Sequence, residues 1–271
     1  MIAPLQTLEP DTVFYPDSDG KPMAENTLQA EWIVTIMGNL ACQYRDDPNV
    51  FVAMDNFIYA VRGNNTLCTA PDVYVAFGRP KGHRGSYKVW LEDGIFPQVI
   101  FEIFSPGNTQ REMDEKHDFY FRYGAEEFYI YDPEDNTLEG YLQSDTGITP
   151  VEDWATFVSP RMGIRFELVG HDLHIYGANG QRFRTFLEVD ERAEQADFEA
   201  KRAKQAVQKA KRETERAKKA DERAKQAGLQ AKQADLQAKQ AGQRADNLAA
   251  SLEQLRAKMI AAGLDPDEDG V

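Results

Sequence analysis

The last third of the chain follows a residue spacing that a long α-helix produces. From residue 203 to residue 245, alanine recurs three and four positions apart, and Glu213 is the one exception. Larger apolar residues then continue the same spacing as Leu248, Leu252, Leu255 and Met259. A 3,4 alternation sustained over roughly eight heptads is typical of a coiled coil. We therefore predict a coiled-coil helix over residues 188–260, about 105 Å long.

The partner of this helix is less well determined than the helix itself. Alanine buries little apolar area, so an alanine layer stabilises helix pairing less than a leucine layer does. A single solvated helix is the alternative interpretation. The boundary at residue 188 leaves residues 1–187 for a globular domain and residues 261–271 for an acidic, disordered tail.

Charge is distributed unevenly between these segments. Residues 1–187 carry 14 basic and 28 acidic residues, whereas residues 188–260 carry 17 basic and 13 acidic ones. An acidic globular domain argues against sequence-independent nucleic-acid binding, because that affinity comes mostly from neutralised phosphates.

Cellular location is suggested by what the sequence lacks. Its two cysteines do not form a disulfide framework or a zinc motif. The N-terminus shows no signal-peptide pattern, and no apolar run approaches the length of a membrane span. We expect a cytoplasmic protein without a membrane segment.

The globular segment alternates helical and strand patterns, which predicts an α/β domain with a mixed sheet. We expect helices at about 27–45 and 109–123, the first capped by Asn26 or Thr27 and the second ending at Gly124. The expected strands are 50–54, 57–61, 69–77, 98–104, 127–131 and 138–142, with weaker candidates near 164–168 and 173–176 that would extend the sheet. A long loop is expected over 78–97.

Two carboxylates lie within strand-like apolar runs. Asp72 lies in Thr-Ala-Pro-Asp-Val-Tyr-Val-Ala-Phe, and Glu102 lies in Gln-Val-Ile-Phe-Glu-Ile-Phe-Ser-Pro. A carboxylate buried in such surroundings is costly unless it is paired, and a shared divalent cation is one way to pair two of them. The backbone carbonyl of Ile103 would be a third hard ligand. The alternatives are that Asp72 only caps a turn and that Glu102 faces solvent on an edge strand.

A cation for phosphate chemistry could come from the helix that follows Glu102. Glu112, Lys116 and Tyr120 lie at i, i+4 and i+8 and share one helix face. If this face packs across the sheet, Lys116 reaches over Glu102 and Tyr120 lies beside it. The alternative is a surface lysine paired with Glu112.

These residues carry a family resemblance. The chain resembles the PD-(D/E)XK, or restriction-endonuclease-like, superfamily. The resemblance lies in Pro71-Asp72, followed after about thirty residues by Glu102 on a strand and then by a helix. Within this superfamily the chain is more similar still to the Uma-two type branch of endonucleases, over about residues 12–187. Members of this branch often carry a coiled tail like this one. The similar segments start at Tyr15 (Tyr-Pro-Asp-Ser-Asp-Gly-Lys-Pro-Met), Ala70 (Ala-Pro-Asp-Val), Phe77 (Phe-Gly-Arg-Pro-Lys-Gly-His-Arg-Gly-Ser-Tyr), Phe101 (Phe-Glu-Ile-Phe-Ser-Pro-Gly-Asn-Thr), Tyr123 (Tyr-Gly-Ala-Glu-Glu-Phe-Tyr-Ile-Tyr-Asp-Pro) and Ser159 (Ser-Pro-Arg-Met-Gly-Ile-Arg-Phe-Glu).

The resemblance implies a Mg²⁺- or Mn²⁺-dependent endonuclease that hydrolyses DNA phosphodiesters. It implies Asp72 and Glu102 as metal ligands, with Glu25 as a further acid. The superfamily pattern places a lysine two residues after the second acid, where this chain has Phe104. In several branches this lysine lies on the following helix, which makes Lys116 the candidate, and Lys116-x-x-x-Tyr120 is similar to the Gln-x-x-x-Tyr motif of related exonucleases.

DNA contacts are expected from one basic loop, because Arg79, Lys81, Arg84 and Lys88 are four of the fourteen cations in residues 1–187. We also expect a homo-oligomer, joined through the coiled coil and the nuclease-like domain. The alternative function is a catalytically inactive nuclease-fold scaffold that oligomerises or recruits partners through its coiled coil.

Overall fold

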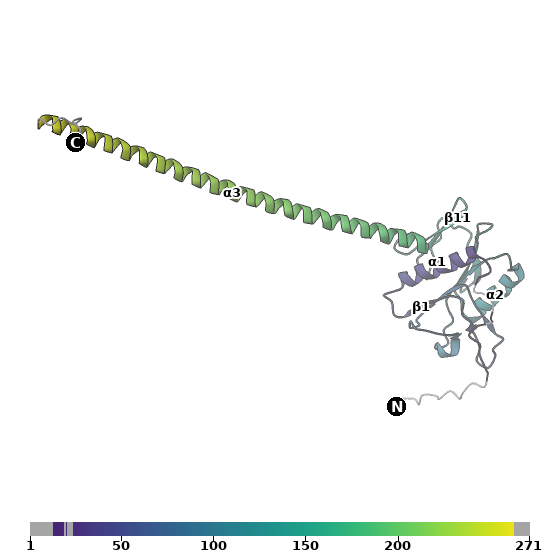
Figure 1. The fold of residues 1–271 in the computed structure, drawn as a ribbon. Coiled ribbons are helices and arrows are strands. Elements are labelled where there is room, and N and C mark those ends of the chain that lie inside the picture. Colours follow the sequence, from purple (N-terminus) through teal and green to yellow (C-terminus); the bar gives the residue numbers. More distant parts are fainter. Residues whose placement is uncertain (1–12, 19, 21–23, 263–271) are drawn as a thin grey trace, which may run out of the picture. The chain divides into compact units, whose positions relative to one another are not determined.

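The computed structural model describes residues 13–18, 20 and 24–262 (Figure 1). The chain divides into two compact units, Met1–Arg192 and Ala193–Val271. The helices are α1 Thr27–Gln43, α2 Gln110–Tyr123 and α3 Phe186–Ala261, with a short 3₁₀ turn at Val89–Leu91. The strands are β1 Val50–Ala53, β2 Ile58–Tyr59, β3 Cys68–Thr69, β4 Val73–Phe77, β5 Tyr87–Lys88, β6 Val99–Ile103, β7 Glu127–Asp132, β8 Thr137–Ser144, β9 Gly147–Pro150, β10 Arg165–Val169 and β11 Asp172–Tyr176.

The main sheet has six strands in the order β1-β4-β6-β7-β8-β9. Strands β6 and β7 are parallel, and every other neighbouring pair in this sheet is antiparallel. A parallel pair needs a crossover connection, and α2 provides it between β6 and β7. The predicted α/β fold with a mixed sheet, flanking helices and a long C-terminal helix is confirmed.

Helix α2 begins and ends where its sequence signals predict. The Thr109 side chain accepts a hydrogen bond from the Glu112 N–H, and the Glu112 carboxylate accepts one from the Thr109 N–H, which forms a capping box. Gly124 ends the helix with φ 124°, a conformation that L side chains rarely adopt. These two signals fix the first and last residues of the helix.

Several details of the strand prediction are wrong. The run 69–77 is not one strand, because β3 ends at Thr69 and β4 begins at Val73 in a different sheet, so Asp72 directly precedes β4. Strands β10 and β11 do not extend the main sheet; they form a separate antiparallel pair, and Phe166, Leu173 and Ile175 from this pair pack into the core. The expected loop over 78–97 contains β5, which pairs with β2 in a small sheet that also includes β3. Strand β5 has only two residues, too few to show a periodic pattern, so the sequence could not predict it, whereas β2 lies within the expected strand 57–61.

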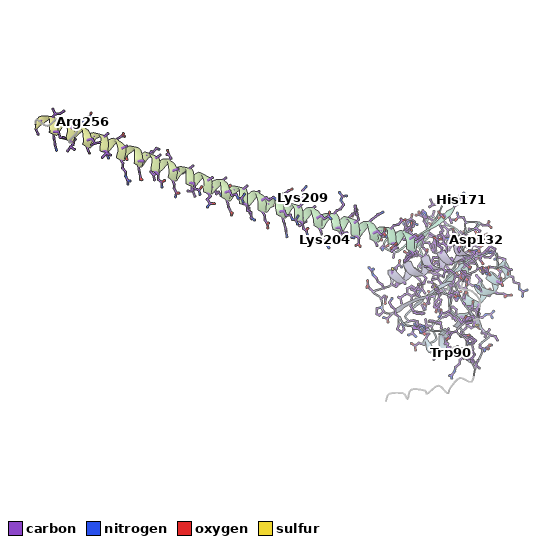
Figure 2. The ribbon with its side chains drawn as sticks, viewed as in Figure 1. Trp90, Asp132, His171, Lys204, Lys209 and Arg256 are labelled. Atoms are coloured by element: carbon purple, nitrogen blue, oxygen red, sulfur yellow. The ribbon has the colours of Figure 1, made fainter. Side chains whose placement is uncertain are left out.

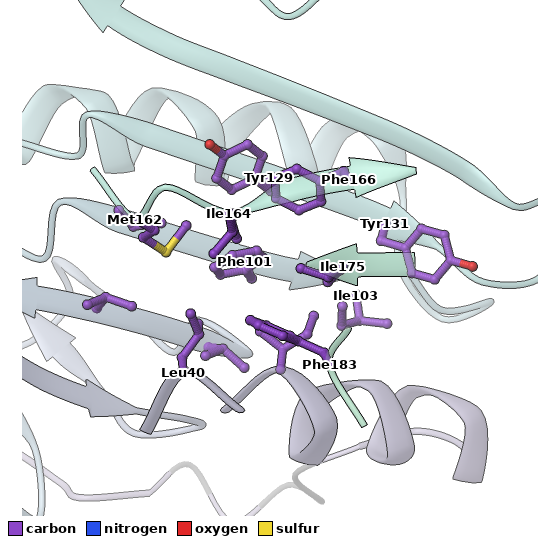
Figure 3. Packing of buried hydrophobic residues seen from close by; sticks show 14 of the residues in the cluster. Leu40, Phe101, Ile103, Tyr129, Tyr131, Met162, Ile164, Phe166, Ile175 and Phe183 are labelled. Atoms are coloured by element: carbon purple, nitrogen blue, oxygen red, sulfur yellow. The ribbon is translucent and has the colours of Figure 1, made fainter. Parts of the chain in front are cut away.

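The two faces of the main sheet carry separate apolar clusters. The first cluster packs α1 against one face through Ile33, Ile36 and Leu40. It includes Phe101 and Tyr129, whose ring centroids lie 5.1 Å apart (Figure 3). The second cluster packs α2 against the other face. Its members include Tyr74, Ile100, Met113, Tyr120, Phe121 and Phe128.

Strand periodicity assigns the residues of β6 to these two faces. Val99, Phe101 and Ile103 belong to the α1-side cluster, whereas Ile100 belongs to the α2-side cluster. Because successive side chains of a strand point to opposite faces, Glu102 points to the α2 side. Asp72 directly precedes β4, and continuing the alternation of that strand back by one residue places Asp72 on the same side as Tyr74.

Helix α3 is exposed along its described length, and none of its described side chains is buried. Figure 2 labels Lys204, Lys209 and Arg256 along this helix. The helix itself is confirmed, whereas its pairing with a partner stays a prediction. No helix in the described part of the chain combines the length and apolarity that crossing a membrane would require.

Candidate functional site

The register of β4 and β6 places the two strand carboxylates opposite each other. Val73 pairs with Phe101 in this antiparallel ladder, so Asp72 falls across from Glu102, one residue beyond. Asp72 is 8% exposed and Glu102 is 2% exposed. Strand β6 lies between β4 and β7, which excludes the alternative that Glu102 faces solvent on an edge strand.

Helix α2 supplies two hydrogen-bond donors to the Glu102 carboxylate. The Lys116 ammonium donates to Glu102 Oε2 at 2.7 Å, and the Tyr120 hydroxyl donates to Glu102 Oε1. Lys116 is therefore not the surface lysine of the alternative interpretation. Phe104 instead packs beside the α2-side cluster. The structure thus brings together Asp72, Glu102, Lys116 and Tyr120, whose roles in function stay predictions.

Asp72 is held by the peptide that follows Glu102. The Ile103 N–H donates to Asp72 Oδ2 at 2.6 Å. Burial and then the charge of Glu102 raise the pKa of Asp72 to about 8, although the hydrogen bond from the Ile103 N–H, the charge of Lys116 and the nearby polar side chain of Gln29 oppose the rise. Two carboxylates that face each other in a buried site therefore favour an added positive charge.

Lys116 stays protonated in the same surroundings. Burial lowers the pKa of Lys116, but the charge and hydrogen bond of Glu102 and the charge of Asp72 outweigh it and hold this pKa above its ordinary value. Burial and then the charge of Glu102 raise the pKa of Tyr120 well above its ordinary value, so Tyr120 remains a hydrogen-bond donor.

Asp72, Glu102 and Lys116 line a pocket of about 230 Å³. One lysine, Lys116, is the only cationic residue among its lining residues in the described part of the chain. The acidic lining residues are Asp17, Glu25, Asp55, Asp72, Glu102 and Glu112. Such an excess of negative charge attracts cations and repels phosphate unless a cation is present.

The residues of the pocket fit a divalent cation. Asp72 and Glu102 of the lining offer carboxylate oxygens, and the carbonyl of Ile103, the residue after Glu102, is a further hard oxygen donor. Mg²⁺ is usually bound through one or two carboxylates and completed by water and substrate phosphate. Among the residues that the structure describes, no group of three or more His, Cys, Asp and Glu side chains is arranged to hold a metal. The fit therefore rests on two carboxylates and one backbone carbonyl.

The predicted additional acid, Glu25, also lies at this pocket. The Ser105 hydroxyl donates to Glu25 Oε2 at 2.7 Å. A Cβ added at Gly107 would lie 2.0 Å from the same Glu25 oxygen, so glycine is needed there if the carboxylate is to keep its position. The turn after β6 therefore holds the Glu25 carboxylate in the lining of the pocket that also contains Asp72 and Glu102.

The cations of the basic loop make contacts within the protein. Arg79 pairs with Asp93 at 2.7 Å, and Arg84 binds both carboxylate oxygens of Glu92 at 2.6 and 3.1 Å. Lys81 donates to the Tyr44 and Val50 carbonyls, and the Lys88 ammonium lies 5.2 Å from the centroid of the Tyr15 ring. Contacts of these four residues with DNA stay a prediction.

Sequence reasoning missed Gln29, which lines the pocket from α1. Its side-chain amide donates to the Ile103 carbonyl at 3.0 Å. One signal could have identified it, since residues 29, 33, 36 and 40 fall on one helix face and the other three are apolar. A polar residue in such a row is expected to have a buried hydrogen-bond partner.

Comparisons with known proteins extend these observations. The model of the Uma2 family, described as "Putative restriction endonuclease", matches residues 7–168. A solved structure described as "a putative nuclease belonging to DUF820", from Anabaena variabilis ATCC 29413, is 14% identical with a TM-score of 0.39. The match covers 51% of this chain and 74% of that one. A comparison with curated proteins found no match.

Proposed function

The chain belongs to the Uma2 family, and from this membership and the geometry of the pocket we propose that it is a nuclease that hydrolyses DNA phosphodiester bonds with Mg²⁺ or Mn²⁺. The observation that carries the proposal is the convergence of Asp72, Glu102 and Lys116 in one acidic pocket. The first two residues come from neighbouring strands and the third comes from the helix that covers them.

In this proposal Asp72, Glu102 and the Ile103 carbonyl hold the cation, and Glu25 supplies a further carboxylate at the pocket. A bound divalent cation would supply Lewis-acid polarisation of the phosphate and a more acidic water. The protein keeps its ligands in place through the Ile103 N–H on Asp72 and the Tyr120 hydroxyl on Glu102.

Lys116 supplies the positive charge that Phe104 cannot supply, because a phenyl ring has neither a charge nor a hydrogen-bond donor for a phosphate oxygen. Its ammonium is anchored on Glu102 and its side chain is 27% exposed, so it also lines the pocket. From this position Lys116 offsets negative charge that develops on the scissile phosphate.

Cleavage is expected to depend strictly on a divalent cation, since six carboxylates line the pocket and would repel phosphate without one. The test incubates purified full-length protein with supercoiled, linear and single-stranded DNA in Mg²⁺, in Mn²⁺ and in excess chelator. Products should form with the cations and not with the chelator. Intact DNA under every condition, with Mn²⁺ binding demonstrated by calorimetry, would favour the scaffold alternative instead.

We further propose that residues 1–187 form the nuclease domain and that residues 188–260 pair with a second copy of the chain. The support is the apolar row of Leu248, Leu252, Leu255 and Met259, whose leucines are all more than half exposed on α3. A row of this kind at coiled-coil spacing stabilises helix pairing by removing apolar surface from water. Mutual burial of this row is the reason to expect a dimer.

Light scattering on full-length protein should therefore give a mass at least twice that of one chain. The double substitution Leu252→Glu with Leu255→Glu should reduce this mass to that of a monomer. Leu229→Glu with Leu236→Glu is the matched control, because these leucines are as exposed but lie outside the row. A wild-type monomer, or equal dissociation by both double variants, would refute pairing through this row.

A further inference from the structure

Gln29 lies where the periodicity of α1 predicts an apolar residue. It is 6% exposed and shares the buried face of the helix with Ile33, Ile36 and Leu40. A buried amide costs free energy unless its donor and acceptor are both bonded. Gln29 also lines the pocket, so its side-chain hydrogen bonds bear on the pocket as well as on the core.

Both ends of the Gln29 side-chain amide are used. Oε1 accepts from the Glu25 N–H at 2.8 Å, and Nε2 donates to the Ile103 carbonyl at 3.0 Å. The Gln29 backbone is held in turn, since its N–H donates to the Asn26 side chain at 2.8 Å in the N-cap of α1. The amide thus joins the start of α1 to the end of β6, across 74 residues of sequence.

The residue that Gln29 bonds, Ile103, directly follows Glu102 of the pocket lining and is bonded to Asp72. The Ile103 N–H donates to Asp72 Oδ2, and the Ile103 carbonyl accepts from Gln29. The Ile103 residue is therefore held at its N–H by one proposed ligand and at its carbonyl by Gln29. Gln29 consequently restrains the direction of the Ile103 carbonyl and, through Ile103, the position of the Asp72 carboxylate.

We propose that Gln29 is a positioning residue that aligns the Ile103 carbonyl and Asp72 for a divalent cation. The inference rests on the proposed function, because it concerns the same cation. Gln29 also holds the backbone of Glu25, so three of the proposed oxygen donors are connected to this amide. Side chains that orient the ligands of a metal change its affinity about 10- to 100-fold when they are removed.

The same helix offers a matched control. Gln43 also donates its amide to a distant backbone carbonyl, that of Met162, at 3.0 Å, and accepts from the Ala178 N–H at 3.1 Å. Gln43 does not line the pocket. Its hydrogen bonds are of the same kind but less buried than those of Gln29, and they hold backbone groups outside the pocket.

The experiment measures Mn²⁺ binding to full-length protein by calorimetry, without DNA, for wild type, Gln29→Met and Gln43→Met. Both variants should lower the melting temperature, because each loses an amide–carbonyl hydrogen bond, and the Gln29 variant should lower it more because its partner groups are buried. Only Gln29→Met should weaken Mn²⁺ binding, by about 10- to 100-fold. If Gln29→Met does not fold by circular dichroism, Gln29→Ala, which leaves room for water at the Ile103 carbonyl, takes its place with the same expected direction.

The outcomes separate this inference from the proposed function. Wild-type protein that does not bind Mn²⁺ would refute the proposed function and the role of Gln29 together. Wild-type binding with unchanged affinity in the Gln29 variant would overturn the role of Gln29 alone. Equal weakening in the Gln29 and Gln43 variants would also overturn it, because loss of general stability would then explain both.

Discussion

Asp72→Asn is expected to abolish divalent-dependent DNA cleavage and to raise the melting temperature of the metal-free protein. The cleavage rate should fall at least about 100-fold, as expected when a metal site is impaired. Stability should rise because the substitution removes a buried charge opposite Glu102 while it keeps an oxygen that can accept from the Ile103 N–H. The measurements are the DNA cleavage assay and thermal unfolding in excess chelator.

The gain in stability should depend on pH. The folded-state pKa of Asp72 is about 8, whereas its ordinary value is 3.8, so the folded protein binds a proton more tightly than the unfolded chain. The stabilisation from this proton is fully present below the unfolded pKa and is lost as the pH rises through the folded pKa. The difference in melting temperature between Asp72→Asn and wild type should therefore grow between about pH 5 and pH 8.

Glu127→Gln is the matched control, since Glu127 is also a buried carboxylate but lies outside the pocket. Glu127 accepts hydrogen bonds from Ser159, Tyr129 and the Arg161 N–H, so its replacement should cost about 1–3 kcal/mol of stability and leave cleavage intact. Wild-type cleavage by Asp72→Asn would remove Asp72 from the proposed ligands. A fall in its melting temperature would contradict the unfavourable pairing with Glu102.

Lys116→Met should also abolish cleavage, but it should destabilise the protein. The expected loss in rate is about 100- to 1000-fold, as for removal of a group that stabilises transition-state charge. Without Lys116, the buried Glu102 carboxylate loses its ion pair and keeps the Tyr120 hydroxyl. Removing one partner of a buried pair costs about 3–5 kcal/mol, and partial exposure of Lys116 favours the lower end of this range.

Two further variants separate the charge of Lys116 from its packing. Lys116→Arg keeps the positive charge and should retain more stability than Lys116→Met. Combining Lys116→Met with Glu102→Gln removes both charges, so the melting temperature should recover in part while cleavage stays absent. Efficient cleavage by Lys116→Met would show that another group offsets the phosphate charge. It would refute the proposal that Lys116 takes the role of the lysine expected where this chain has Phe104.

Elements with a repeating local pattern could be predicted from the sequence. The alanine and leucine spacing predicted the long helix that the structure shows as α3, and Thr109 and Gly124 marked the limits of α2. The apolar runs around Glu102 and Tyr129 predicted β6 and β7. Each of these signals lies within one segment and depends on helix or strand periodicity or on helix capping.

The candidate site could be predicted only in part. The face shared by Lys116 and Tyr120 follows from helix geometry, but its contact with Glu102 depends on how α2 packs on the sheet. Likewise, Arg79 and Arg84 of the basic loop bind acidic residues 14 and 8 positions away. No periodic pattern in the sequence specifies these partners.

The sequence by itself therefore determined the elements of this protein and the residue types available for a cation site. The tertiary structure alone decided that Asp72 stands across from Glu102, that Gln29 reaches Ile103, and that β10 and β11 form their own sheet. The physical reason is that helix and strand periodicity is set by neighbouring residues, whereas strand register and helix packing are set by contacts between distant segments. A shift of one residue in the register of β4 would have turned Asp72 to the other face of the sheet.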